Sequence, residues 1–261
     1  MRYGILGSLR VTSNGREFTL HSNKQQVLLT ALLLRADQVV PTGQLIEELW
    51  GDNIPRRADA NLYVHICQLR KFLAAARVAE GEILTRPPGY QLRTGAAELD
   101  SAEFAGLVAK GRAALGRGSA AEAAVLLGEA VSLHRGPVLG GLPGGPIVTN
   151  FAVRAEESRL ECLELWITAS LALGRHREVV GQLYSLTAAH PLREQFYRLL
   201  MIALSRCGRP ADALGVYQRA RAVMAQELGV GPGLPLRQLH RGLLTGEGGA
   251  VENLGARARI C

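Results

Sequence analysis

Residues 58–75, ADANLYVHICQLRKFLAA, decide how the N-terminal part of this chain folds. No Pro or Gly interrupts the stretch, so a helix can run through it without a break. Its large aliphatic residues recur at the spacing that places them on one side of a helix: Leu62, Ile66, Leu69 and Leu73. The stretch therefore predicts one helix of about five turns with a buried apolar face.

The other face of this predicted helix is short, polar and basic, with one acidic residue, Asp59, at its start. Such a face can lie against the edges of bases while neighbouring cations meet phosphates. From the helix alone, an ordinary amphipathic surface helix is the commoner interpretation. The stretch that follows favours the first interpretation.

Residues 83–93 predict a β-hairpin, because two short strand-like pieces flank the turn Pro87-Pro88-Gly89-Tyr90. The tip region of this hairpin holds Arg86 and Tyr90. A helix followed by a basic hairpin is the order of a winged helix, in which the helix enters the major groove and the wing reaches phosphates or the minor groove.

The elements before the helix agree with this order. Residues 2–20 alternate around an Asn14-Gly15 turn and predict a small antiparallel sheet. Helices are expected over 24–35 and 44–50, with Thr42 capping the second, and residues 39–41 are expected to be extended.

From residue 100 onward the sequence predicts helix after helix. Asp100 with Glu103 predicts a capping box at the start of the first helix. A 34-residue repeat pairs Gly174-Arg175 with Gly208-Arg209, and an earlier turn at Gly116-Arg117 is expected to begin a further unit. This pattern indicates a tetratricopeptide-like superhelix, and such stacks bind proteins more often than they catalyse reactions.

Several motifs, in their order along the chain, resemble a known family. Over residues 1–93 these are Leu49-Trp50-Gly51, Val64-His65-Ile66, Leu69-Arg70-Lys71 and the stretch from Arg86 to Tyr90. Over residues 99–244 they are Leu173-Gly174-Arg175, the stretch from Ala189 to Glu194, and Glu227-Leu228-Gly229-Val230. Together they resemble the Streptomyces antibiotic regulatory protein family, with an OmpR-type winged helix and a bacterial transcriptional activation domain.

The resemblance implies a mainly α fold with a small β part. It implies a winged-helix DNA-binding domain over 1–95 and an all-α tetratricopeptide-like domain over 99–244, and the tail at 245–261 is expected to be disordered. Relatives activate secondary-metabolite (antibiotic) gene clusters. They bind double-stranded DNA in pairs on direct repeats near the promoter −35 region and recruit RNA polymerase through its sigma factor or alpha subunit. In the family, the loop that corresponds to residues 51–55 can touch RNA polymerase.

On this reading the helix over 58–75 enters the major groove. Asn61, Val64 and Gln68 are the candidates for base edges, with Tyr63 as a further one. The candidates for backbone contacts are Lys24, Arg57, His65, Arg70, Lys71 and, on the wing, Arg86. Three residues have structural alternatives: Trp50 as a core anchor or a phosphate donor, His65 as a core or phosphate-binding histidine, and Tyr90 as a plug of the wing or a DNA contact.

The totals agree with a nucleic-acid partner. The formal net charge is +7 and the isoelectric point about 9.6, and the N-terminal part is the more basic per residue. The four cysteines form no C-x-x-C pair, which argues against zinc and disulfides and fits a reducing cytoplasm. No enzyme motif, cofactor motif or membrane-spanning stretch occurs. The alternative is a peptide-binding scaffold whose N-terminal domain docks to something other than DNA.

Overall fold

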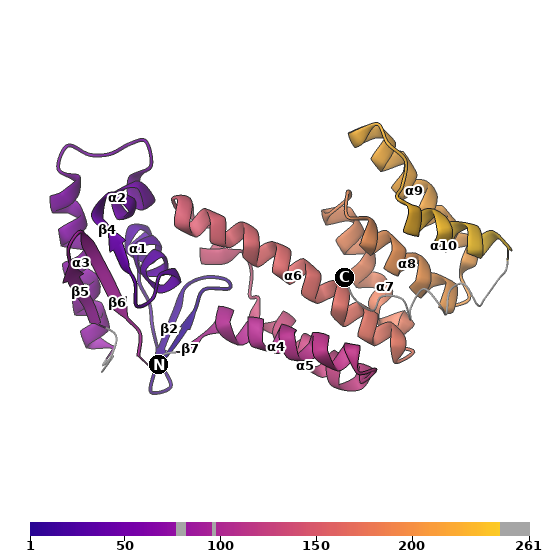
Figure 1. Ribbon diagram of the computed structural model, residues 1–261, viewed down its shortest axis with the longest axis horizontal. Coiled ribbons are helices and arrows are strands. Elements are labelled where there is room, and N and C mark those ends of the chain that lie inside the picture. The colour runs from indigo at the N-terminus through magenta and orange to yellow at the C-terminus, as the bar shows by residue number, and fades with distance from the viewer. Residues whose placement is uncertain (77–81, 96–97, 246–261) are drawn as a thin grey trace. The chain divides into compact units, whose positions relative to one another are not determined.

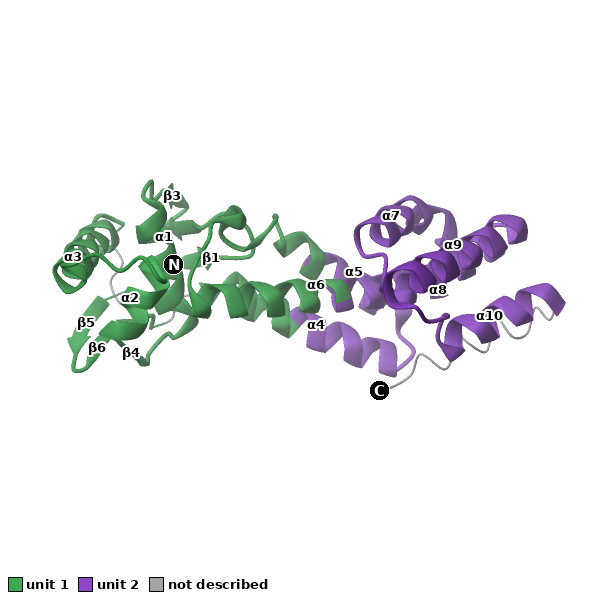
Figure 2. Ribbon diagram, turned by 90° about the horizontal axis from the view of Figure 1, so that it is seen from above, with its two compact units in different colours: residues 1–106, 130–160 green, residues 107–129, 161–261 purple. Residues whose placement is uncertain are grey.

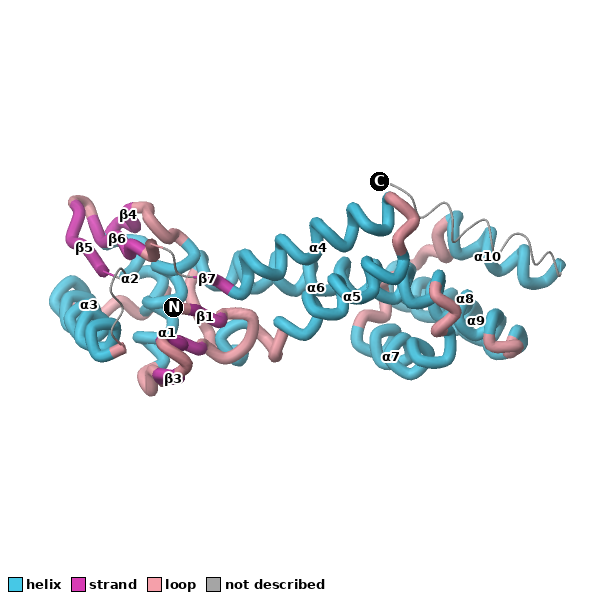
Figure 3. Tube along the Cα trace, turned by 90° about the horizontal axis from the view of Figure 1, so that it is seen from below, coloured by secondary structure: helices cyan, strands magenta, loops and turns pink. Residues whose placement is uncertain are grey.

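The computed structural model describes residues 1–76, 82–95 and 98–245 (Figure 1). Helices dominate the described chain, and the strands are short and lie near the N-terminus (Figure 3). The predicted fold class, a winged helix followed by tetratricopeptide-like helices, is confirmed. The chain divides into two compact units, residues 1–106 with 130–160, and residues 107–129 with the residues from 161 onward (Figure 2).

The first unit begins with a four-stranded sheet in the order β3-β2-β1-β7. Asn14 and Gly15 both have positive φ, as a tight hairpin turn between β2 and β3 requires. The antiparallel hairpins were predicted, whereas the parallel pairing of β7 with β1 was not. The bounds are Arg2–Gly4 for β1, Arg10–Ser13 for β2, Arg16–Phe18 for β3 and Glu98–Leu99 for β7.

The winged helix follows, with three helices and a three-stranded sheet in the order β4-β6-β5. The helices are α1 (Asn23–Leu34), α2 (Thr42–Trp50) and α3 (Ala58–Ala75), and the strands are β4 (Val39–Pro41), β5 (Glu82–Arg86) and β6 (Gly89–Arg93). The core between them is aliphatic and includes Leu28, Leu32, Leu62, Ile66 and Leu92. The bounds of α3 are those that the apolar periodicity predicts.

The start of α2 differs from the prediction in one respect. Thr42 lies inside the helix and Pro41 precedes it, so Thr42 is not the cap. Its hydroxyl donates to the backbone oxygen of Pro88 at 3.1 Å, and its backbone N–H donates to the same oxygen at 3.1 Å. Thr42 therefore ties α2 to the turn of the hairpin, a partner 46 residues away that no local pattern indicates.

Two carboxylates tie the N-terminal elements of the first unit to later helices. Glu48 of α2 is 3% exposed and accepts the backbone N–H groups of Ile147 and Val148 at 2.8 and 3.0 Å. These belong to the first turn of α6 (Pro146–Ala172), where orphan N–H groups favour a negative charge. Gly145 lies so close to the backbone of α2 that a Cβ on this residue would be 2.4 Å from the Cα of Glu48.

Asp100 is the second carboxylate, and the capping box predicted for it is wrong. It opens α4 (Asp100–Gly116), yet its oxygens accept the N–H groups of Ile5 and Leu6 at 2.9 and 3.1 Å. The guanidinium of Arg135 pairs with it at 3.0 Å, and Glu103 pairs with Arg2. Buried backbone N–H groups need acceptors, and this carboxylate supplies them for the two residues that follow β1.

The second unit is built on repeated turns between antiparallel helices. Gly118, Gly174 and Gly208 have φ of +79°, +78° and +76°. In each case the next residue donates its N–H to a carbonyl five positions back (Ala114, Ser170 and Leu204), the Schellman arrangement that ends a helix. The 34-residue spacing is confirmed for the last two turns. The first turn lies at Gly118, because α4 continues through Gly116.

The remaining helices continue the succession of helices that the sequence predicts. They are α5 (Ala120–Leu133), α7 (His176–Ala189), α8 (Glu194–Arg206), α9 (Pro210–Leu228) and α10 (Leu234–Thr245), with a short 3₁₀ turn, η1 (Val138–Gly141), before α6. The tail expected to be disordered lies, from residue 246, outside the described residues.

Replacing Glu48 by Ala should destabilise the protein strongly. The change leaves two backbone N–H groups at the start of α6 without their acceptor, at a cost of about 2 to 5 kcal/mol in the free energy of unfolding. Urea unfolding followed by circular dichroism measures it. The neighbouring Glu47, which is exposed, is the matched control, and Glu47→Ala should stay within about 0.5 kcal/mol of wild type. Equal midpoints for the two variants would refute this role.

Candidate nucleic-acid interface

Helix α3 has one face in the core and one face in solvent. Leu62, Ile66 and Leu69 are fully buried and Leu73 is 2% exposed, so the helix cannot turn about its axis without losing this packing. Asn61, Val64 and Gln68 lie together on the opposite face, and all three are exposed. The residues predicted to meet base edges are thus side by side at positions i, i+3 and i+7, and Tyr63 and Lys71 flank them in solvent.

Gln68 is held by a second glutamine. Gln25, in the first turn of α1, donates its side-chain amide to Oε1 of Gln68 at 2.6 Å. The Nε2 group of Gln68 and a lone pair of its oxygen remain free for a partner. An amide held in one orientation can pair with adenine through both of its atoms. The local sequence gives no sign of this contact, because its partners lie 43 residues apart.

Trp50 forms the centre of a small cluster where α1, α2 and α3 meet. Its ring packs on the edge of the core, with Lys24 Nζ 4.4 Å from the ring centroid and the His65 ring 6.2 Å away. Burial lowers the pKa of Lys24. Burial, and then the charge of Lys24, lower the pKa of His65, whose Nδ1 is buried without a hydrogen-bond partner. The cluster therefore keeps one cation partly desolvated at the surface, where an anion would stabilise it.

The wing is fastened to α3 by Arg70. This guanidinium donates to the backbone oxygen of Ile83 at 2.8 Å and to the hydroxyl of Thr85 at 2.9 Å. These bonds occupy two of its five donors, so Arg70 joins α3 and β5 whether or not it also meets a phosphate. Directly after the turn of the wing, a Cβ on Gly89 would lie 1.9 Å from the oxygen of Val40, so only glycine fits there.

The charged and aromatic side chains of the wing differ in exposure. Arg86 is exposed at the turn, paired in register with Gly89. Tyr90 is half-buried, opposite Thr85 in the ladder, and packs against the winged-helix core. Arg57, just before α3, is exposed, as is its neighbour Arg56. The predicted candidates thus fall into three groups on the first unit: the α3 face, the cluster around Trp50, and the wing.

The described residues offer neither a metal-binding cluster nor a membrane-spanning helix. Over residues 1–76, 82–95 and 98–245, no three His, Cys, Asp or Glu side chains come together in a way that would hold a metal ion. Within the same ranges, no helix is both long enough and apolar enough to cross a membrane. Cys67, Cys162 and Cys207 are free thiols, and burial raises the pKa of Cys162 to about 12.

Comparison with known families covers both halves of the chain. Residues 15–92 match the model of the C-terminal domain of transcriptional regulatory proteins, and residues 99–244 match the bacterial transcriptional activator domain. A solved structure of Mycobacterium tuberculosis EmbR, in complex with a low-affinity phosphopeptide, superposes with a TM-score of 0.89 at 30% identity. It covers 98% of this chain and 68% of that chain.

Similar proteins of known name are also regulatory proteins. The chain is 39% identical over 260 residues to the regulatory protein AfsR of Streptomyces coelicolor, covering 99% of this chain and 26% of AfsR. It is 33% identical over 259 residues to the regulatory protein DnrI of Streptomyces peucetius, covering 97% of this chain and 95% of DnrI. The chain therefore spans about a quarter of AfsR and nearly all of DnrI. With both family domains in order, it belongs to the Streptomyces antibiotic regulatory protein family of transcriptional regulators.

Proposed function

We propose that this regulator binds promoter DNA sequence-specifically, with α3 in the major groove and the β5–β6 wing against the neighbouring backbone or minor groove. The observation that carries the proposal is the exposed face of α3, where Asn61, Val64 and Gln68 stand free of the core. A helix of this kind, fixed by its buried side, presents a constant set of groups to base edges.

Each side chain has a chemistry suited to its place. Gln68, oriented by Gln25, is suited to adenine, and Val64 to the methyl group of thymine. Asn61 and Tyr63 add hydrogen-bonding groups at the edge of the same face. The cations and donors around this face, for phosphates, are Lys24, Trp50, Arg57, His65, Lys71 and Arg86, and Tyr90 supports the wing from behind.

The regulator would act as an activator of a secondary-metabolite, or antibiotic, gene cluster. One recognition helix per chain gives a limited interface, which favours two copies on direct repeats near the −35 region. RNA polymerase, through its sigma factor or alpha subunit, is the proposed protein partner. In support, Ile54 is 57% exposed in the loop before α3, and Leu228, Val230 and Leu234 are more than half exposed where α9 passes into α10.

Substitutions on α3 and on the wing should have different effects on DNA binding. Gln68→Ala removes a base contact and should weaken binding to the operator about 5- to 150-fold, equivalent to about 1 to 3 kcal/mol. Arg86→Ala removes a phosphate contact and should lower affinity for all sequences, reducing the salt slope by about 1. Both effects are measured by fluorescence anisotropy over a salt series. The DNA fragments are promoters next to the regulator's own gene and a scrambled control.

Gln226→Ala and Arg221→Ala are the matched controls, since both side chains are exposed on α9. They should bind like wild type. If the wild-type protein binds both fragments equally and loses both steeply with salt, only counterion release remains. Sequence-specific binding by this chain alone would then be rejected.

Gln25→Met should weaken discrimination more than affinity. The substitution keeps the length of the side chain but removes the donor that orients Gln68. We expect operator binding to fall about 2- to 10-fold, because one neutral hydrogen bond contributes about 0.5 to 1.5 kcal/mol. Binding to the scrambled fragment should not change. An equal loss on both fragments would show that Gln25 contributes through the phosphates instead.

Ile54→Asp should separate activation from DNA binding. The side chain is 57% exposed and lies outside α3 and the wing, so operator affinity should stay within about twofold of wild type. Transcription from the same promoter with purified RNA polymerase should fall about tenfold, because a charge would face the proposed protein contact. Full transcription by the variant would exclude this loop as the polymerase contact.

A further inference from the structure

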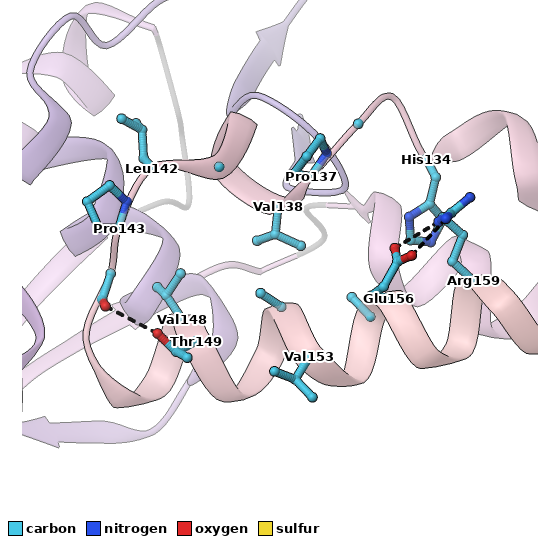
Figure 4. A pocket seen from close by; sticks show the side chains of 15 residues that line it. His134, Pro137, Val138, Leu142, Pro143, Val148, Thr149, Val153, Glu156 and Arg159 are labelled. Carbon is cyan, nitrogen blue, oxygen red and sulfur yellow. Dashed lines mark hydrogen bonds and ion pairs between the residues drawn. The ribbon is translucent and has the colours of Figure 1, made fainter. Parts of the chain in front are cut away.

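A cavity of about 680 Å³ lies within the first unit, between the segment 136–144 and the first turns of α6 (Figure 4). Its walls are mostly apolar and include Val138, Leu142, Val148 and Val153. This volume and this lining are typical of sites for small molecules. None of the DNA-facing residues lines the cavity, so the proposed function does not account for it.

The segment opposite α6 contains three successive residues in the left-handed region of backbone conformation. Leu139 has a φ of +53°, which a branched side chain rarely adopts, and Gly140 and Gly141 follow with φ of +65° and +82°. Leu139 is 1% exposed and belongs to the winged-helix core, so its burial holds the turn in place. Backbone strain that the surrounding core maintains is often found at ligand-binding sites.

Polar groups gather at one end of the cavity. Glu156 and Arg159 form a double hydrogen-bonded ion pair at 2.7 and 2.8 Å, and His134 lies beside them (Figure 4). The His134 ring packs edge-on against Phe104 at 4.7 Å, and its buried Nε2 has no hydrogen-bond partner. Burial, and next the charge of Arg159, lower the pKa of His134, which favours the neutral imidazole. The polar end as a whole carries no net charge.

We propose that this cavity binds an uncharged, largely apolar small molecule whose hydroxyl group hydrogen-bonds to His134. A hydroxyl can donate or accept, so it suits either tautomer of the imidazole of His134, which lines the cavity. An ionic ligand is disfavoured, because Glu156 and Arg159 already neutralise each other and a further charge would lose its water without a counter-ion.

The same turn of α6 that lines the cavity also contacts the winged helix. Val148 contributes its side chain to the cavity wall, and its backbone N–H is held by Glu48 of α2. A ligand that moves this turn would therefore change how α2 is held. This consequence rests on the proposed function: ligand and operator should then alter each other's affinity by the same factor.

The test uses 2-naphthol, 2-naphthoate and naphthalene as probes that share a ring system and differ in their polar group. Binding to the full chain, without DNA, is measured by probe fluorescence and calorimetry. We expect 2-naphthol to bind at one site per chain and at least tenfold more tightly than 2-naphthoate or naphthalene. His134→Phe keeps a ring against Phe104, and it should reduce the affinity for 2-naphthol to that for naphthalene.

Two further variants block the cavity. Ala152→Trp fills it, and Val153→Asp, at a side chain that is 67% exposed, places a charge at its rim without disturbing the core. Both should weaken the binding of 2-naphthol at least tenfold. Ala225→Trp, on the exposed surface of α9, should leave it unchanged. No binding of 2-naphthol, equal binding of 2-naphthoate, or unchanged binding in Val153→Asp would each overturn the proposal.

Operator binding is measured separately, with and without saturating 2-naphthol. At least a threefold change in wild type that is lost in Val153→Asp supports the link to α2. An unchanged operator affinity with bound probe would refute that link and leave the cavity as a binding site. Failure of operator binding without any probe would instead count against the proposed function, so the two failures are distinguishable.

Discussion

Burial of four aliphatic side chains along one side of α3 fixes the rotation of that helix about its own axis. Each fully buried side chain of this size contributes about 1.5 to 3 kcal/mol, so together they hold the helix far more firmly than a surface contact would. The orientation of Asn61, Val64 and Gln68 toward solvent is a consequence of this packing. Arg70 then extends the same rigid body to the wing through its bonds to β5.

Buried carboxylates connect the segments of the first unit that are distant in sequence. Glu48 and Asp100 each accept two backbone N–H groups from residues about a hundred positions away. Both act at places where the backbone has no other acceptor, the first turn of α6 and the end of β1. The residues 130–160 consequently belong to the same compact unit as the winged helix, although family comparison places them in the activator domain.

Local patterns in the sequence were enough to predict the helices and the hairpins. The periodicity of residues 58–75 and the Pro/Gly turn at 87–89 act over a few residues, so their outcome can be read directly. The parts that could not be predicted depend on distant partners. Thr42 and Asp100 look like helix caps, but the hairpin turn and the β1 end compete for them. The Gln25–Gln68 contact and the cavity likewise exist only once the chain has folded.

The division of α3 into a packed side and a free side bears on how such regulators diversify. Asn61, Val64 and Gln68 contribute nothing to the core, so their replacement leaves the stability of the domain almost untouched. A duplicated copy of this gene could therefore change its operator one substitution at a time, with every intermediate variant still folded. The same freedom would let an engineer reassign the regulator to another promoter by editing three surface positions and keeping the scaffold.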